Sequence, residues 1–442
     1  MKTIALLILN LLVCLQGISQ QVYSLEDCFA VAKENNVSLK KSRNDIDISY
    51  IDKKAAIFNL LPAMYANVEH VFSTGKNIDP VTNNFVKDDF SGGEFDLTLQ
   101  LNIFLGFTAL NAIKSSLYKT KAGEYAYQKN ELQTFSEITT AYARLMYAKE
   151  QVATIKNDNL PTQNELEVVQ ESINVGKLSK SDFYTINTRY KTEQAALAEA
   201  QNDSTKAIND LKFLTGISYN KAFDVKDVDS TEIKNIASME FRLTNLLEEI
   251  LKDHPALQES VYAEKSAAMN LKTAKGNLMP SVSLEGNIFS NYNLNDKNFT
   301  GNKIAVGQQL DNNLGKTVGV LVQIPIFNRY QGRFDIEKEK INLSNAKLAK
   351  QQIENDIVQN TQQLANDFMA AQKKYSLQTE ALQQNVLAYD AYEERHKLGY
   401  ISSLELIIAK DQLYAQQVRT IQAKYDLYFR YKLIELLLKD YN

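Results

Sequence analysis

The sequence predicts a mostly α-helical chain that also contains a few membrane-type β-strands, arranged as two copies of one unit. Glycine and proline are scarce, at 16 and 6 of 442 residues, which is below the usual roughly 7% and 5% and favours long, uninterrupted elements. Short segments alternate between apolar and polar residues, as strands with one buried face do. The same order of helices, strands and turns recurs in both halves of the chain, as expected of an internal repeat.

Residues 1–20 have the pattern of a secretory signal peptide. Lys2 precedes an apolar run at residues 4–15, and the small residues Gly17 and Ser19 suit cleavage by signal peptidase. The apolar run is too short to cross a bilayer as a helix, which takes about 20 residues. No later segment resembles a transmembrane helix, so we expect any membrane-spanning part to be made of strands.

The two cysteines bear on anchoring and redox chemistry. Cys14 leaves open a lipoprotein anchor, although Val13 is bulkier than the small residue that normally precedes a lipidated cysteine. After removal of the signal peptide only Cys28 remains, so no disulfide can form within the chain. We expect Cys28 to be a small buried thiol.

The duplication sets the predicted domains. Gly176 and Gly399 stand in similar turns 223 positions apart, and this offset holds from residues 104–176 to residues 327–399. Each copy shows a helix, a strand, a loop, a strand, a long helix, a turn and a helix. The predicted domains are the first repeat at 21–217, an inter-repeat segment at 218–239 and the second repeat at 240–442.

Four strands are predicted, and one of them has an unbroken alternating pattern. In residues 95–103 every odd position is apolar, and the even positions are Asp96, Thr98, Gln100 and Asn102. Strands of nine to eleven residues can span an outer membrane when tilted, and aromatic residues cluster towards the strand ends as they do at membrane interfaces. The predicted strands lie at about 63–72, 94–104, 281–290 and 317–327, with polar loops between the two strands of each copy.

The helices are predicted to be unusually long and to pack as coiled coils. Residues 333–398 contain no glycine or proline, and at 1.5 Å per residue such a helix extends about 100 Å. Pro161 predicts a kink or break in the first copy. After each turn, apolar residues recur at steps of three and four, a coiled-coil seam that Asp411 interrupts in the second copy and Glu193 and Ser204 in the first.

The chemistry of an enzyme is missing from the sequence. The three histidines are isolated, and the Gly315-Lys316-Thr317 segment lacks the earlier glycine of a phosphate-binding loop. No dinucleotide or nucleophile motif is present, so we predict no catalytic activity, no cofactor and no metal site. Charges are balanced, with 49 basic and 53 acidic residues and no basic block with interleaved aromatics, which argues against a nucleic-acid partner.

The duplicated order of elements resembles the TolC family of bacterial outer-membrane factors. The resemblance rests on the Leu-Pro and Met-Pro segments before the strands, the Ile-Pro-Ile-Phe segment at 324–327 and the two Gly-x-x-Ser turns. Four strands in one chain cannot close a barrel, and open strand edges are not tolerated in lipid, so several chains must share one barrel. The resemblance implies a homotrimer with a 12-stranded β-barrel in the outer membrane and a coiled-coil helical barrel in the periplasm.

The resemblance also implies roles for particular residues. The lumen of the β-barrel would be lined by Asp96, Thr98, Gln100 and Asn102, with the apolar row of 95–103 facing lipid, and the inter-repeat segment would add to a belt around the helical tunnel. A periplasmic adaptor would contact the two turns, and the periplasmic gate would include an acid after each turn, although both acids could instead favour the start of a helix through its dipole. The adaptor-contact residues would be Val175, Gly176, Lys177, Leu398, Gly399 and Tyr400, and the gate residues Asp182, Glu405 and Ile408.

The function implied is that of a passive channel. It would conduct substrates from periplasm to exterior, joined by the adaptor to an inner-membrane pump in a tripartite efflux system. The alternative within the fold is the exit channel of a type I protein-secretion system. The sequence leaves open whether the gate has the latch of the best-known relative, because Ile401 and Ile408 stand at the positions of its basic residue and second acid.

Overall fold

The computed structural model describes residues 22–78, 84–87, 89–176, 179–240, 243–298 and 300–438. The predicted signal peptide, with Cys14, lies outside the described residues. The chain divides into two compact units. The sheet unit is formed by Ile46–Glu124 and Glu259–Gln351, and the hairpin unit by Met1–Asp45, Tyr125–Gln258 and Gln352–Asn442.

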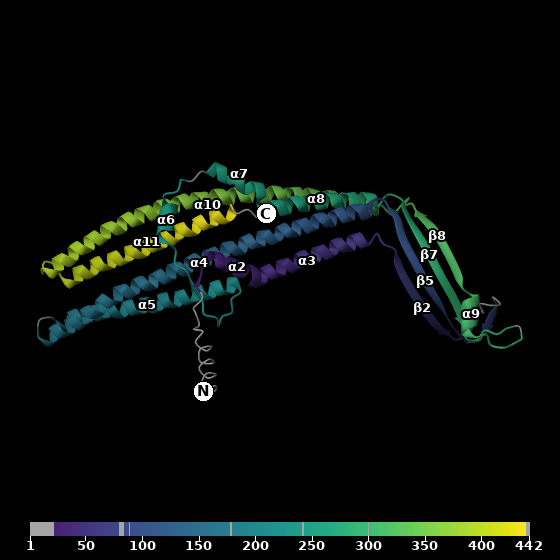
Figure 1. Cartoon of the computed structure of the whole chain (residues 1–442), viewed down its shortest axis with the longest axis horizontal. Helices are drawn as coiled ribbons and strands as arrows, with labels where there is room; N and C mark the ends of the chain where they lie inside the picture. Colours follow the sequence, from purple (N-terminus) through teal and green to yellow (C-terminus); the bar gives the residue numbers. More distant parts are fainter. Residues whose placement is uncertain are drawn as a thin grey trace, which may run out of the picture. The chain divides into compact units, whose positions relative to one another are not determined.

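The sheet unit contains one antiparallel sheet of four long strands. Its order is β2 (Ala63–Ser73), β5 (Phe90–Leu105), β7 (Ser281–Asn293) and β8 (Gly315–Gln323), and Figure 1 shows these strands side by side. The two strands of each sequence copy are therefore joined to those of the other copy through the pairing of β5 with β7. Within the described residues no strand pairs with the outer edge of β2 or of β8.

Several strand boundaries differ from those predicted, including the end of β7, which reaches Asn293 and not about residue 290. β5 begins at Phe90 and is 16 residues long, so it extends into what the sequence suggested was loop. β8 ends at Gln323, although the alternating pattern suggested a strand to residue 327. Pro325 has no N–H to donate to a ladder, which explains an early end to a strand at the edge of the sheet.

The polar segments between the strands are also partly ordered. The first contains a short hairpin of β3 (Lys76–Ile78) and β4 (Phe85–Lys87). The second contains the short helix α9 (Val306–Asn312), which contacts β7. The remaining helices that contribute to the sheet unit are α3 (Val37–Phe58) and α8 (Pro255–Gly276), together with parts of α4 and α10.

The hairpin unit is built from two pairs of long helices. The first pair is α4 (Thr108–Asn174) and α5 (Lys180–Thr215), and the second is α10 (Gln331–Lys397) and α11 (Ser403–Leu437). α10 has the length expected from the sequence, at 67 residues. α4 is also 67 residues long and continues through Pro161, so of the predicted kink or break, the break is wrong. A proline removes only one hydrogen bond of a helix ladder, and packing of α4 on α5, seen in the Thr162–Glu193 hydrogen bond, supports the helix there.

Shorter elements complete the hairpin unit. They are β1 (Val22–Tyr23), α2 (Leu25–Asn35), β6 (Asp224–Val225), α6 (Ser230–Ala237) and α7 (Leu243–Asp253). β1 pairs in parallel with β6, so the first described residues are bound to the inter-repeat segment. One core cluster joins Leu25 and Cys28 of α2 to Leu145 of α4, Leu211 of α5 and Tyr425 of α11. A second cluster surrounds Phe368 of α10.

Among the helices that the structure describes, none combines the length and the apolar character needed to cross a membrane.

Candidate channel surfaces

The sheet has one apolar face, and much of it is exposed. Val318 and Val320 of β8 are 81% and 62% exposed, and Val68 of β2 is 77% exposed. The register places these side chains on one face, because Val320 lies opposite Leu284, which in turn lies opposite Leu101. An exposed apolar band of this kind is the feature expected of strands that face lipid.

The opposite face is polar, and it contains the residues predicted to line a lumen. Asn67 Nδ2 donates a hydrogen bond to Asp96 Oδ2 at 3.0 Å, and Thr98 Oγ1 donates to the same oxygen at 3.1 Å. Thr98 also lies opposite Asn287 of β7, with 3.4 Å between their side-chain oxygens. Gln100 and Asn102 lie opposite Glu285 and Ser283 and share this face, so the structure brings all four predicted residues together on one surface.

A β-bulge changes the faces near the end of β5. The register passes from Asn102 opposite Ser283 directly to Phe104 opposite Val282, so Ile103 is an extra residue without a partner in this ladder. Val282 shares the apolar face with Leu284 because side chains two apart lie on the same side of a strand. The bulge therefore places Phe104 on the apolar face, where the simple alternation predicted Ile103.

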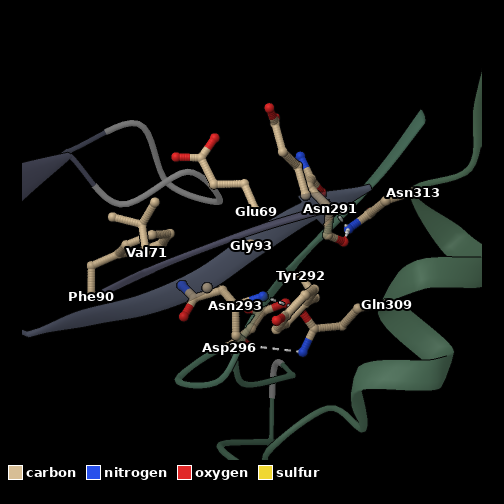
Figure 2. Close-up of a pocket in the computed structure, with 12 residues that line it drawn as sticks. Glu69, Val71, Phe90, Gly93, Asn291, Tyr292, Asn293, Asp296, Gln309 and Asn313 are labelled. Atoms are coloured by element: carbon tan, nitrogen blue, oxygen red, sulfur yellow. Dashed lines mark hydrogen bonds between the residues drawn. The ribbon is translucent and has the colours of Figure 1, made fainter. Parts of the chain in front are cut away.

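A cavity of about 660 Å³ lies on the polar face, at the end of the sheet next to α9. Figure 2 shows Glu69 of β2, Asn291 and Asn293 of β7, and Gln309 and Asn313 around it. Glu69 lies directly opposite Glu94 in the ladder of β2 and β5, which places two carboxylates side by side at the cavity wall. Like charges in this position are destabilising unless water or a counter-ion separates them.

The two hairpin turns have the same geometry in both copies. Gly176 and Gly399 have φ angles of 76° and 77°, in the left-handed region that glycine adopts without strain. The Gly399 N–H donates to the His396 carbonyl and the Tyr400 N–H to the Arg395 carbonyl, both at 2.9 Å, which is the pattern of a Schellman motif. The Gly176 N–H donates to the Ile173 carbonyl at 2.9 Å in the same way.

The turns present apolar side chains to solvent. Val175, Leu398 and Tyr400 are 68%, 67% and 74% exposed. A Cβ added to Gly176 or Gly399 would meet no atom within 4 Å, so the backbone conformation and not the available space requires glycine within this chain. Lys177 lies outside the described residues.

Glu405, predicted at the gate, caps the start of α11. Its Oε2 accepts hydrogen bonds from the Ser402 N–H and the Ser402 hydroxyl, both at 2.9 Å, while the Ser402 Oγ accepts from the Glu405 N–H at 3.3 Å. These bonds form a capping box, and they hold the pKa of Glu405 below its ordinary value. Ile408, one turn further on, is 50% exposed. Asp182 belongs to the first turn of α5, and its side chain lies outside the described residues.

A charged cluster that the sequence reasoning missed joins the two helix pairs. Arg189 Nε lies 2.8 Å from Glu193 Oε1 on α5, and Arg189 Nη2 lies 3.2 Å from Asp411 Oδ1 on α11. Arg189 Nη1 donates to the Ile407 carbonyl at 3.2 Å, and Thr162 of α4 donates to Glu193 Oε1 at 3.0 Å. The sequence signal was present, because Glu193 and Asp411 are two of the residues that interrupt the apolar seams.

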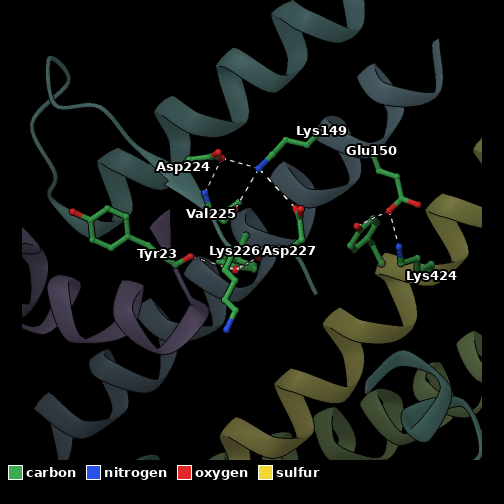
Figure 3. A network of polar contacts seen from close by, with 10 residues as sticks. Tyr23, Lys149, Glu150, Asp224, Val225, Lys226, Asp227 and Lys424 are labelled. Atoms are coloured by element: carbon green, nitrogen blue, oxygen red, sulfur yellow. Dashed lines mark hydrogen bonds and ion pairs between the residues drawn. The ribbon is translucent and has the colours of Figure 1, made fainter. Parts of the chain in front are cut away.

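A second polar network holds the inter-repeat segment (Figure 3). Lys149 Nζ of α4 lies 2.7 Å from Asp224 Oδ1 and 3.8 Å from Asp227 Oδ1. The next residue, Glu150, accepts bonds from Lys424 Nζ at 2.7 Å and from the Tyr425 hydroxyl at 2.6 Å. Burial, together with the bond to Glu150, raises the pKa of Tyr425, so its hydroxyl stays a donor. One turn of α4 thus binds the inter-repeat segment on one side and the C-terminal helix α11 on the other.

The titratable side chains of the described residues bear on metal binding and on thiol reactivity. No group of three His, Cys, Asp or Glu side chains in the described part of the chain could hold a metal ion. Cys28 is buried, and burial raises the pKa of its thiol to about 12, which makes it unreactive at neutral pH.

A sheet with an exposed apolar face and a polar face, carried together with two pairs of long helices, defines a membrane channel protein of the outer-membrane type. The chain belongs to the outer membrane efflux protein family, whose sequence model matches residues 67–217 and 246–436. This result confirms the resemblance to the TolC family that the repeated order of elements indicated, and with it an efflux channel in the outer membrane.

Individual relatives are distant in sequence but match over nearly the whole chain. The outer membrane efflux protein BepC of Brucella suis biovar 1 is 22% identical over 418 residues, covering 91% of this chain and 82% of BepC. The outer membrane protein TolC of Escherichia coli K12 is 21% identical, covering 92% of this chain and 80% of TolC. The crystal structure of the CmeC outer membrane channel of Campylobacter jejuni has the same fold, with a TM-score of 0.76 at 17% identity, covering 94% of this chain and 85% of CmeC.

Proposed function

We propose that three copies of this chain close a shared β-barrel and act as a passive duct through the outer membrane. The observation that carries the proposal is the sheet of four strands with an exposed apolar face and two outer edges, β2 and β8, without a strand partner in the described residues. Open edges are too costly in lipid to remain unpaired. Because neighbouring strands alternate in direction, β8 runs opposite to β2, so β2 of a second copy can add to β8 in antiparallel pairing.

The two faces of the sheet fit this role. The apolar side chains of Val68, Val318 and Val320 would lie against lipid, and the cluster of Asp96 and Thr98 would line the lumen. Asn67 and Thr98 both donate hydrogen bonds to Asp96, and these bonds hold the polar side chains in place. A lumen lined in this way would be hydrated and constant in shape, as a passive duct requires.

The partners in this proposal are a periplasmic adaptor and an inner-membrane pump. The exposed apolar residues Val175, Leu398 and Tyr400 at the turns are the surface that we assign to the adaptor. The efflux role is preferred to protein secretion because the family that matches this chain is described as efflux proteins. The polar network around Lys149 and Asp224 would stiffen a belt formed with the inter-repeat segment.

The test is the oligomeric state and conductance of the purified protein. In detergent, light scattering is expected to give a protein mass of about three mature chains, each lighter than the 50.0 kDa of the full sequence by the signal peptide. Planar bilayers are expected to show ion conductance without any energy source. A stable monomer that neither oligomerises in detergent nor conducts in bilayers would refute the proposal. Conductance by a protein of another mass would retain the duct and reject the trimer.

A further inference from the structure

β7 is longer than its neighbour β8, and this leaves part of one edge without a strand. β7 pairs with β5 up to Asn293, but with β8 only up to Phe289. Residues 290–293 therefore have a strand on one side only within the described part of the chain. An edge of this kind is a template on which another strand can add.

Helix α9 occupies this edge through the side chain of Gln309. The Asn293 N–H donates to Gln309 Oε1 at 2.8 Å, and Gln309 Nε2 donates back to the Asn293 carbonyl at 2.9 Å, as Figure 2 shows. A primary amide thus reproduces the two-way hydrogen bonding of a β-ladder. Gln309 is only 3% exposed, and its Nε2 also donates to the Ile304 carbonyl at 2.9 Å, so the side chain is fixed from both sides.

Two neighbouring contacts extend the same arrangement. Asn313 Nδ2 donates to the Asn291 carbonyl at 3.0 Å, two residues further down the same edge. The Ser290 hydroxyl donates to the Leu310 carbonyl of α9 at 2.7 Å. β8 begins next to these contacts, at Gly315. The ring of Phe289 covers this glycine, because a Cβ added to Gly315 would lie 2.3 Å from the ring.

We propose that α9 is an edge stop that fixes where a second copy of this chain adds its strand β2. The proposal rests on the proposed barrel closure and specifies its register. With Gln309 and Asn313 bonded to residues 291–293, a strand of the neighbouring copy can pair with β8 and cannot continue along β7. The start of β8 at Gly315 then becomes a fixed limit for the incoming strand.

A stop is needed because the apolar pattern alone does not fix the register. On the shared face, Val318, Val320 and Val322 of β8 stand two positions apart, and the β2 residues of that face are spaced in the same way. A slip of two residues keeps every side chain on its face and therefore costs little in burial. β2 has 11 residues and β8 has nine, so their lengths do not define one alignment either. The residues on the shared face are Met64, Ala66, Val68, His70 and Phe72 in β2, and Val318, Val320 and Val322 in β8.

Disulfide trapping between copies in the full-length protein tests this register. Val320→Cys is combined in turn with a cysteine at each β2 residue of the shared face, and dimers are counted after mild oxidation. A disulfide requires Cβ atoms about 3.5–4.5 Å apart, so one β2 position is expected to dominate. The native thiol of Cys28 is buried and does not contribute.

The decisive comparison adds Gln309→Leu to each cysteine pair, which removes the amide bonded to Asn293. Asn313→Ala is a second disrupting variant, because it removes the bond to Asn291. Gln308→Leu, on the exposed side of α9, is the matched control. Loss of the amide pair is expected to spread the disulfides to the position two residues away, with roughly a tenfold fall in the preference for one partner, as expected from losing two hydrogen bonds. Gln308→Leu is expected to keep the single partner.

The outcomes separate the two proposals. If the parent cysteine pairs trap no disulfide between copies and the protein is a monomer, barrel closure fails and the edge stop fails with it. If one partner dominates in the parent and still dominates in both Gln309→Leu and Asn313→Ala, closure stands and the edge stop is refuted.

Discussion

The carboxylate of Glu405 caps the start of a helix, and we propose that it also lines the periplasmic gate. One of its oxygens, Oε2, closes the capping box with Ser402, and the charge is exposed at the start of α11. The pKa of Glu405 lies below its ordinary value of 4.5 because of these hydrogen bonds. Its contribution to the stability of the helix start is therefore complete above about pH 4.5 and is lost as the pH falls through the lowered pKa.

Two substitutions separate the cap from the charge. Glu405→Gln keeps a side-chain acceptor for Ser402, because glutamine also serves in a capping box, but it removes the negative charge. We expect it to lower cation selectivity, measured as the reversal potential in a salt gradient across a planar bilayer, with unchanged hydrogen exchange at residues 403–406. In the trimer that we propose, three such charges would lie near one axis and attract cations, and their removal is the physical reason for the expected loss.

Glu405→Ala is the matched variant, since it removes both the charge and the acceptor. It is expected to lower selectivity to the same extent and also to accelerate hydrogen exchange at residues 403–406. Unchanged selectivity in both variants, with faster exchange in Glu405→Ala only, would mean that Glu405 is a capping residue and that the gate lies elsewhere.

The charged cluster around Arg189 explains the two charged residues that interrupt the apolar coiled-coil seams. Glu193 and Asp411 each interrupt an apolar seam, and both are within salt-bridge distance of Arg189. Arg189 and Glu193 are nearly buried, with side chains 10% and 14% exposed. Removing one partner of such a nearly buried pair leaves the other charge uncompensated, which is strongly destabilising.

At the scale of elements, the strands depend on departures from ideal alternation. A bulge at Ile103 places Phe104 on the apolar face, and α9 takes the place of a strand beside residues 290–293. Pro325 accounts for the end of β8. Each departure lies at a strand end or an outer edge, where the ladder has fewer hydrogen bonds to lose.

The two faces of β8 allow a charge to be placed on either side of the sheet at almost the same depth. Val320 lies on the apolar face, and its neighbour Leu321, opposite Ser283, lies on the polar face. Val320→Lys is expected to destabilise the folded barrel by about 2–4 kcal/mol, the usual cost of a lysine facing the middle of the bilayer. Leu321→Lys is expected to cost much less because a lumen gives the charge access to water.

Unfolding by denaturant in lipid vesicles measures this difference, and trypsin resistance of the inserted protein provides a second readout. Equal destabilisation by the two lysines would contradict the assignment of the faces. A larger cost for Leu321→Lys than for Val320→Lys would show that the polar face, and not the apolar one, is turned to lipid.

At the scale of the whole molecule, the two repeats share a plan but differ in detail. The turns at Gly176 and Gly399 have nearly identical φ angles. The helices that follow them do not match residue for residue, since Glu193 of the first copy is replaced at the equivalent offset by Gln416, which bonds Gln378 of α10. The backbone conformation of the turns is therefore common to the two repeats, and the polar contacts along the helix seams differ between them.

Replacing both glycines by asparagine tests whether the turns contact a partner. Asparagine tolerates positive φ better than other residues, and a side chain at either position meets no atom of this chain within 4 Å. We expect Gly176→Asn combined with Gly399→Asn to leave the oligomer and its helix content intact but to abolish efflux in cells, because the added side chains block the approach of an adaptor. Efflux is measured as sensitivity to toxic substrates in a strain that depends on this protein.

A control on the far side of the turn is supplied by Ser402→Thr, which keeps the capping hydroxyl and is expected to preserve efflux. Normal efflux in the double asparagine variant would indicate that the glycines only end their helices. Loss of the oligomer itself would show that backbone strain at the turns reaches the barrel, which contradicts the expected independence of the two effects.

The sequence by itself determined the architecture, because periodicity over long segments is a strong signal. Scarce glycine and proline predicted the long helix α10, alternation predicted the strands and their polar face, and the repeated glycines predicted two equivalent turns. The resemblance that followed from this order was confirmed by the family match. These features depend on local pattern, which tertiary contacts modify little.

Only the tertiary structure decided which polar residues meet. Nothing in the sequence pairs Arg189 with Asp411, or Gln309 with the backbone of Asn293, because each contact joins separate elements whose alignment depends on the packing of the unit. The continuous helix through Pro161 and the bulge at Ile103 were decided in the same way. In both places packing outweighs the local preference of one residue, since many contacts together exceed the cost of one lost hydrogen bond.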